Sequence, residues 1–195
     1  NGGRLGFMSG LEANELFLLS DVVAGKYTVD QRMMLQADIL RGDQVVDTFH
    51  CLNDAVVTRG DYARLIDVNI HCEERPVWDV RADGVIVSTP TGSTAYSMAA
   101  GGPVVSPETD CFVVTSICPH SLIDRSIVFP SSKALYVQVQ NDVDNNSIFT
   151  ADGKRPVQID GHTVVRISKS PYVARLIKVK PDNFYEILRK KIIER

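Results

Sequence analysis

The sequence predicts a mainly β domain, arranged as a sandwich, with a short helix near each end of the chain. Hydrophobic and polar residues alternate through its middle, which is the two-residue period of a half-buried strand. Turn residues separate these segments at the short intervals that are typical of a sandwich. The 195 residues are 44% hydrophobic and 23% charged, which is ordinary for one globular domain.

The first expected helix covers residues 11–24. Ser9 and Glu12 have the spacing of a capping box, and apolar residues follow at helical spacing. Gly25 comes directly after the last of these positions, where a glycine commonly ends a helix. We therefore expect the helix to end at this glycine.

The second expected helix begins near Pro181 and continues to the end of the chain. Apolar side chains fall on one face of it, namely those of Phe184, Ile187, Leu188 and Ile192. Such a face needs a surface to pack on. We expect residues 1–180 to form the sandwich, and residues 181–195 to form a helix that returns to a domain absent from this chain.

The expected strands lie between the two helices. The clearest is 66–72, where Ile66, Val68 and Ile70 alternate with polar residues. The other strands are expected over residues 33–40, 45–58, 84–88, 112–115, 135–140, 164–167 and 175–179. Turns are expected at Arg41-Gly42-Asp43, Arg59-Gly60-Asp61, Glu73-Glu74-Arg75-Pro76, Asp152-Gly153 and Asp160-Gly161.

Composition and spacing argue against several classes of function. The net charge is −3 and no long basic run is present, so we expect no nucleic-acid partner. No apolar run is long enough to span a membrane, and no signal peptide is recognised. The four cysteines form no Cys-x-x-Cys pair, and no metal-ligand spacing is present. We therefore expect no metal site. We also expect the thiols to be buried and the protein to lie in the cytoplasm.

The most unusual segment runs from Asp83 to Ser97. An apolar strand enters a loop of Ser, Thr and Gly residues and continues into a short helix. This arrangement presents backbone N–H groups to polar or anionic ligands, and Tyr96 could stack on a base. The segment matches neither a Walker A loop, nor Gly-x-Ser-x-Gly, nor Gly-x-Gly-x-x-Gly. A ligand site and an ordinary polar loop that caps a helix at Ser93 both remain open.

A second unusual feature is the pair Asn53-Asp54, which interrupts an apolar segment. Both residue types are depleted from strands. A turn is one interpretation. The other is a site whose side chains bind hydroxyl groups or the amide of a base.

Taken together, these motifs resemble those of the NAD kinase family. The resemblance rests on blocks that occur in family order: residues 1–8, Leu52-Asn53-Asp54, residues 83–97, Ala100-Gly101-Gly102-Pro103, Cys118-Pro119-His120-Ser121-Leu122 with Arg125, and Asp152-Gly153. The family has Asn-Glu where this chain has Asn53-Asp54. The resemblance implies a carboxy-terminal β-sandwich with short flanking helices, which an α/β domain precedes in the full enzyme.

The resemblance also implies a reaction and its partners. ATP gives its terminal phosphate to the 2′-hydroxyl of the adenosine ribose of NAD, and the product is NADP. The full enzyme would use NAD, ATP and a divalent metal such as Mg²⁺. It would form a homodimer or homotetramer with shared sites.

Residues of the site follow from the same resemblance. Those implied at the adenosine and ribose positions are Asn53, Thr91, Thr94, Ala95, Tyr96 and Ser97. Asp54 would bind ribose hydroxyls. Asp83 and Asp152 would lie at the dinucleotide site and could reach the ligand of a neighbouring subunit, and Ser116 and Ile117 would approach from that neighbour.

One departure limits the implied activity. The family's Gly-Gly-Asp-Gly motif, which handles ATP and carries the presumed general base, is not found in these residues. Phosphoryl transfer depends on positioning, charge stabilisation and a base near the attacking hydroxyl. We therefore expect this chain to bind NAD, to carry no catalytic residue and to have negligible kinase activity by itself.

Three other readings of the sequence remain. One is a dinucleotide-sensing module without catalysis. Another is a lipid kinase of the diacylglycerol or sphingosine type, although the blocks around Asn53 and Thr91 favour NAD. The last is a purely structural sandwich, which does not explain why polar residues interrupt two apolar strands.

Overall fold

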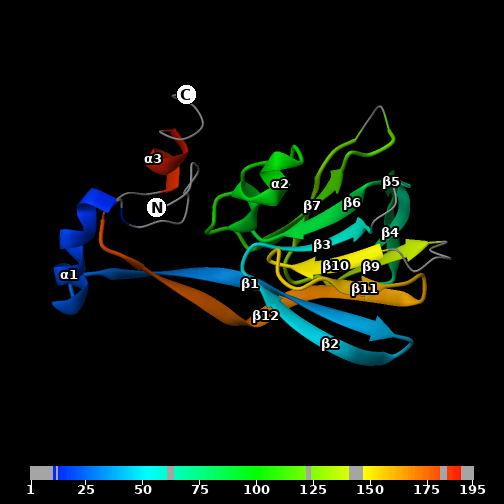
Figure 1. The fold of residues 1–195 in the computed structure, drawn as a ribbon, viewed down its shortest axis with the longest axis horizontal. Helices are drawn as coiled ribbons and strands as arrows, with labels where there is room; N and C mark the ends of the chain where they lie inside the picture. The colour runs from blue at the N-terminus through cyan, green and yellow to red at the C-terminus, as the bar shows by residue number, and fades with distance from the viewer. Residues whose placement is uncertain are drawn as a thin grey trace. The chain divides into compact units, whose positions relative to one another are not determined.

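The computed structural model describes residues 11, 13–60, 64–121, 124–140, 147–180 and 184–189, and most of these lie in two antiparallel sheets (Figure 1). The first sheet has the strand order β2-β1-β12-β9-β4-β5. Its strands are β1 (Thr28–Arg41), β2 (Gln44–Cys51), β4 (Ile66–Cys72), β5 (Arg75–Ala82), β9 (Leu135–Gln140) and β12 (Thr163–Lys178). The predicted mainly β fold is confirmed.

The second sheet has the strand order β11-β10-β3-β6-β7-β8. Its strands are β3 (Asp54–Arg59), β6 (Gly84–Ser88), β7 (Cys111–Ile117), β8 (Ile127–Pro130), β10 (Ser147–Ala151) and β11 (Val157–Ile159). The chain passes between the sheets six times among these strands, and two of the passages, from β2 to β3 and from β5 to β6, lead into the second-sheet strands β3 and β6.

The core of the sandwich lies between the inner faces of the two sheets. Every second residue of a strand points inward, and these residues form one large hydrophobic cluster. Leu35 and Ile70 of the first sheet and Phe112 and Phe149 of the second are fully buried. Burial of each such side chain contributes about 1.5 to 3 kcal/mol.

The contacts divide the chain into two compact units. Met33–Val173 forms one unit and holds the core of the sandwich. Asn1–Arg32 and Ala174–Arg195 form the other. Its described part contains η1 (Ala13–Leu18), α1 (Leu19–Val23), the outer ends of β1 and β12, and α3 (Phe184–Leu188). None of the described helices is long and apolar enough to cross a membrane.

Both predicted helices occur, with differences in detail. The segment over residues 11–24 begins as the 3₁₀ helix η1 and becomes α-helical only in α1. Gly25 follows with a φ of +73°, a left-handed conformation that glycine adopts freely. The capping pair Ser9 and Glu12 lies outside the described residues, as do Pro181, Asp182 and Ile192 of the second helix.

The strand expected over residues 45–58 is wrong as a single element. It is two strands, β2 in the first sheet and β3 in the second, separated by a bend at Leu52-Asn53. The Asn53-Asp54 pair therefore marks the place where the chain changes sheets. Conversely, the segments expected over 164–167 and 175–179 join into the one long strand β12.

Four described strands were not expected, and three of them are edge strands. β5, β8 and β11 each end a sheet. Pro76 lies in β5 and Pro130 in β8, and an edge strand tolerates proline because one of its sides makes no ladder hydrogen bonds. The fourth, β10, buries Ser147 and leaves Ile148 partly exposed, so hydrophobicity does not mark its inward face.

Candidate functional site

Three segments meet at one end of the second sheet. Asp54 at the start of β3 pairs with Ser88 at the end of β6, and Ala55 pairs with Ala151 at the end of β10. The bend before β3, the loop after β6 and the turn after β10 therefore leave the sheet at the same place. We call this the sheet-end cluster. It consists of the Leu52–Asp54 bend, the Thr89–Ala95 loop and the Asp152-Gly153 turn.

The loop is hydrogen-bonded to the bend through Thr89. Its backbone N–H donates to the carbonyl oxygen of Asn53 at 2.8 Å, and its hydroxyl donates to the carbonyl oxygen of Leu52 at 2.6 Å. Gly92 lies so close that a Cβ atom there would stand 2.0 Å from the Asn53 carbonyl oxygen. Only a glycine fits this approach.

The turn is hydrogen-bonded to the bend through the Asp152 carboxylate. This group accepts hydrogen bonds from the backbone N–H groups of Leu52 at 2.9 Å, Asn53 at 2.8 Å and Asp54 at 3.1 Å. Asp152 and Gly153 both have positive φ, and Lys154 N donates to the Ala151 carbonyl at 2.9 Å. The Asp-Gly turn predicted here is confirmed.

Asp54 is a buried acid at the base of the cluster. It is 5% exposed, and no side-chain hydrogen bond to its carboxylate occurs within the described residues. Burial, together with the charge of Asp152, raises the pKa of Asp54 to about 6. The same causes raise the pKa of the neighbouring Cys51 to about 12, so that thiol stays neutral near pH 7 while Asp54 is close to its titration point.

The Thr89–Ala95 loop is stiffened by its own hydroxyl groups. Ser93 Oγ donates to the Pro90 carbonyl at 2.7 Å and accepts from Val105 N at 3.0 Å. Thr94 Oγ1 donates to the Thr91 carbonyl at 3.1 Å. The 3₁₀ turn η2 (Gly92–Thr94) lies within this loop, and the short helix α2 (Tyr96–Ala99) follows it. The loop is therefore preorganised rather than loose.

Side chains at the end of this loop differ in exposure. Ala95 is exposed and Tyr96 is 45% exposed. Thr91 is buried. Ser97 is also buried, and its hydroxyl lies 3.1 Å from the hydroxyl of Thr115 on β7. The Ser97 side chain therefore anchors α2 to the outer face of the second sheet.

Asp83, Ser116 and Ile117 lie at the opposite end of the second sheet. Asp83 Oδ1 accepts from Arg59 Nε at 2.6 Å, and Asp83 N donates to the Ile117 carbonyl at 2.9 Å. Ser116 is hydrogen-bonded to Asp124. Because β3 and β6 are five to six residues long, about 15 Å separates this group from Asp54. Within one chain, the structure does not bring these three residues to the sheet-end cluster.

The model of the ATP-NAD kinase C-terminal domain family matches residues 52–179. This chain belongs to the NAD kinase family. It is 44% identical to the NAD kinase of Symbiobacterium thermophilum over 193 residues, which are 98% of this chain and 68% of that protein. It is 39% identical to the NAD kinase of Thermoanaerobacter sp. (strain X514), covering 100% of this chain and 69% of the relative.

Solved structures of NAD kinases and NADH kinases share the fold. An NAD kinase from Archaeoglobus fulgidus in complex with ATP is 27% identical, with a TM-score of 0.80 over all of this chain and 72% of that one. Yeast NADH kinase complexed with NADH has a TM-score of 0.87 at 24% identity. It covers 96% of this chain, which spans 57% of the yeast protein. The sandwich is therefore the NAD kinase carboxy-terminal fold.

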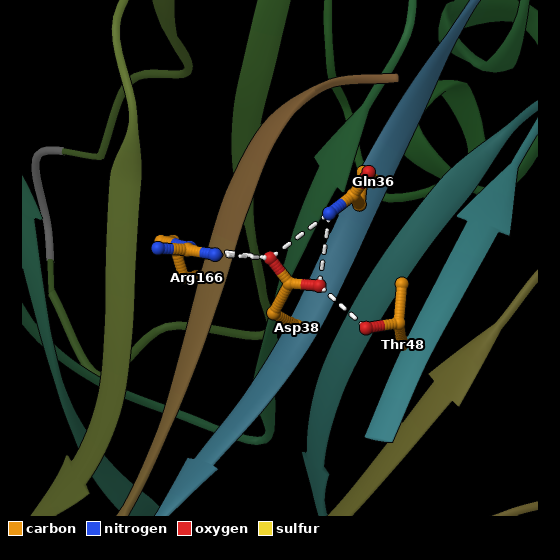
Figure 2. A network of polar contacts seen from close by, with 4 residues as sticks. All are labelled: Gln36, Asp38, Thr48 and Arg166. Carbon is orange, nitrogen blue, oxygen red and sulfur yellow. Dashed lines mark hydrogen bonds and ion pairs between the residues drawn. The ribbon is translucent and has the colours of Figure 1, made fainter. Parts of the chain in front are cut away.

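This NAD kinase domain also has a polar network on the outer face of its first sheet (Figure 2). Asp38 on β1 is 1% exposed and accepts hydrogen bonds from Gln36 at 3.0 Å, Thr48 at 2.8 Å and Arg166 at 2.7 Å. Burial alone would raise the pKa of Asp38, but these hydrogen bonds and the Arg166 charge lower it. Sequence reasoning missed the network, because no local pattern links β1 to Arg166 of β12.

Proposed function

We propose that this chain is the dinucleotide-binding domain of an NAD kinase and that NAD binds at the sheet-end cluster. One observation carries the proposal. Asp54 is a buried acid without a hydrogen-bond partner among the described residues, set between a tightly held bend and a preorganised loop. Burial and the charge of Asp152 make the ionised carboxylate of Asp54 costly to the fold, and ribose hydroxyls would donate hydrogen bonds to it.

Other residues of the cluster, together with Tyr96 and Ser97 of the adjoining helix α2, fit an adenosine. The partly exposed ring of Tyr96 can stack on the base, and Ala95 beside it leaves room for close approach. We assign Asn53, Thr91 and Thr94 to the base and ribose, and Asp54 to the ribose hydroxyls. Ser97 contributes by anchoring α2, because its buried hydroxyl faces Thr115.

In the reaction we propose for the whole enzyme, the 2′-oxygen of the adenosine ribose forms a bond to the terminal phosphorus of ATP. The bond from that phosphorus to the bridging oxygen of ATP breaks, and a base accepts the hydroxyl proton. NADP and ADP are the products. We place the base on the Gly-Gly-Asp-Gly motif, which these 195 residues do not contain.

Mg²⁺ would neutralise charge on the phosphates of ATP in such a reaction. Among the residues that the structure describes, no group of three or more His, Cys, Asp or Glu side chains could hold a metal ion. We therefore assign no Mg²⁺ ligand among these described residues. Its residues bind and orient the acceptor dinucleotide.

We further propose that two copies of the chain share each site, in a homodimer or homotetramer. Asp83, Ser116 and Ile117 lie about 15 Å from Asp54, which is too far to contact the same ribose, but they could reach a dinucleotide bound by a neighbouring copy. Light scattering during size-exclusion chromatography checks this, and a monomer at micromolar concentration would contradict it.

All four cysteines are free. The expectation that their thiols are buried is wrong for two of them, because Cys72 is partly exposed and Cys118 is exposed. Free cysteines fit a reducing compartment, and we propose the cytoplasm.

A thermal-melt titration with NAD tests the proposal, with NADP and ATP as comparisons. A ligand that binds only the folded protein raises stability by about 2.7 kcal/mol at a hundredfold excess over Kd. We expect a saturable rise in melting temperature with NAD or NADP and none with ATP. The absence of a shift at millimolar NAD and NADP would contradict binding by this chain.

A further inference from the structure

We propose that Asp152 is a positioning residue of the dinucleotide site, because its carboxylate holds the bend that carries Asn53 and Asp54. This inference rests on the proposed function. It differs from a direct contact between Asp152 and the dinucleotide. The part played by Asp152 is to fix the backbone from which the binding side chains project.

The hydrogen bonds of the bend carry the argument, because all six of its backbone polar groups are paired. The three N–H groups of Leu52, Asn53 and Asp54 donate to the Asp152 carboxylate. The Leu52 and Asn53 carbonyls accept from Thr89, and the Asp54 carbonyl accepts from Asp152 N at 2.9 Å. Where the chain changes sheets, its backbone N–H groups cannot all pair with a neighbouring strand. A carboxylate such as that of Asp152 can accept hydrogen bonds from these donors instead.

The backbone of Asp152 is suited to this task. Its φ of +48° is a left-handed conformation, which Asp and Asn tolerate better than most side chains do. Gly153 follows at +62°. A carboxylate that accepts three N–H groups makes charge-assisted hydrogen bonds, which are stronger than neutral ones. We infer that the three hydrogen bonds to the carboxylate compensate for the unfavourable left-handed backbone of Asp152.

The Asp152 charge also acts on Asp54. After burial, it is the second cause that raises the pKa of Asp54. The other titratable groups beside this pair are Cys51, which is neutral near pH 7, and Lys154, whose charge favours the ionised form of Cys51. Removal of the Asp152 charge therefore lowers the pH at which Asp54 ionises.

Asp160 offers a matched control within the same chain. It also begins an Asp-Gly turn, but its carboxylate accepts from His162 N at 3.0 Å and Thr163 Oγ1 at 2.6 Å, both within its own turn. An Asp160→Asn variant changes the same charge in the same kind of turn. It leaves the Leu52–Asp54 bend untouched.

The first test compares NAD affinity in Asp152→Asn, Asp160→Asn and the unaltered protein by calorimetry between pH 5 and pH 8. Asparagine tolerates the left-handed backbone but loses one of the two acceptor oxygens and the charge. We expect Asp152→Asn to raise Kd about tenfold to a hundredfold. We also expect the pH below which affinity falls to move downward in this variant. Asp160→Asn should keep Kd within about twofold.

A purely structural role would lower melting temperature without moving the pH profile of binding. Unchanged affinity in a folded Asp152→Asn variant would overturn the inference. If that variant does not fold, Asp152→Glu keeps the charge but displaces the acceptor oxygens. Weaker binding with an unmoved pH profile would then support the inference, and binding equal to that of the unaltered protein would overturn it.

A second test needs no ligand. Amide hydrogen exchange reports directly on the three N–H groups of the bend. We expect Asp152→Asn to speed exchange at Leu52, Asn53 and Asp54, and Asp160→Asn to leave it unchanged. If the unaltered protein fails to bind NAD, the proposed function is rejected. Faster exchange in Asp152→Asn would still support the conclusion that the Asp152 carboxylate fixes the bend. Equal exchange in all three proteins would overturn the inference whether or not NAD binds.

Discussion

The substitution Asp54→Asn should stabilise the fold and weaken dinucleotide binding at the same time. Asp54 is 5% exposed, and its pKa is raised from 3.8 to about 6. Each unit of pKa corresponds to about 1.4 kcal/mol. Well below pH 4, Asp54 is protonated in both the folded and the unfolded protein, so its raised pKa does not change the free energy of unfolding. As the pH rises, ionisation of Asp54 favours the unfolded protein, and the loss of stability reaches about 3 kcal/mol at pH 7.

Asparagine has nearly the same shape and no charge, so it removes this cost. Urea denaturation of both proteins should show a gain of up to about 3 kcal/mol at pH 7 and about half of that at pH 5. Calorimetry should show Kd for NAD raised about tenfold to a hundredfold, since hydrogen bonds to a charged group contribute about 1.5 to 3 kcal/mol each.

Asp43→Asn serves as the control, because Asp43 is exposed in the turn between β1 and β2. We expect it to change stability by less than about 0.5 kcal/mol. A loss of stability in Asp54→Asn at pH 7, or a gain that is the same at pH 5 and pH 7, would refute the reasoning from a buried carboxylate without a partner.

Three further predictions concern other positions. Gly92→Ala places a Cβ atom 2.0 Å from the Asn53 carbonyl oxygen. Thermal melts should therefore show that stability falls by about 3 kcal/mol or more, and NAD binding should be lost. An unchanged melting temperature would contradict the close approach of Gly92 to Asn53. Asp38→Asn should cost about 2 kcal/mol at pH 7. Since the folded pKa of Asp38 is lowered below 3.8, urea denaturation should show that this contribution is lost as the pH falls through the folded pKa, and a difference that does not shrink as the pH falls below 3.8 would count against it. Ser88 Oγ is buried without a partner among the described residues, so Ser88→Ala should be neutral or stabilise the fold by about 1 kcal/mol. Ser97→Ala removes the hydrogen bond to Thr115 and should destabilise the fold by about the same amount. The reverse order in urea denaturation would contradict both assignments.

Sequence patterns predicted the strands that follow a simple rule. β4 and β6 occur with the expected bounds. In β4, side chains alternate between a buried and a half-exposed face, and β6 is buried throughout. The edge strands β5, β8 and β11 were missed because edges expose both polar and apolar residues and accept proline. The change of sheet at Leu52-Asn53 was missed because flanking apolar residues look alike in either sheet.

The candidate site was predictable in its parts but not in its assembly. The Thr89–Ala95 loop and Asn53-Asp54 were recognisable because polar residues interrupt apolar strands. The bonds from Asp152 to the bend join residues about a hundred positions apart, and no local spacing reveals them. The buried state of Asp54 likewise depends on packing that only the folded chain produces.

The most direct test of the central claim is an NMR titration of isotope-labelled protein with NAD, followed through backbone amide shifts. The account predicts saturable changes at the Leu52–Asp54 bend, the Thr89–Ala95 loop and Tyr96, and none around Asp38 on the opposite sheet. Saturable changes confined to the surroundings of Asp38, or no changes at millimolar NAD, would contradict it.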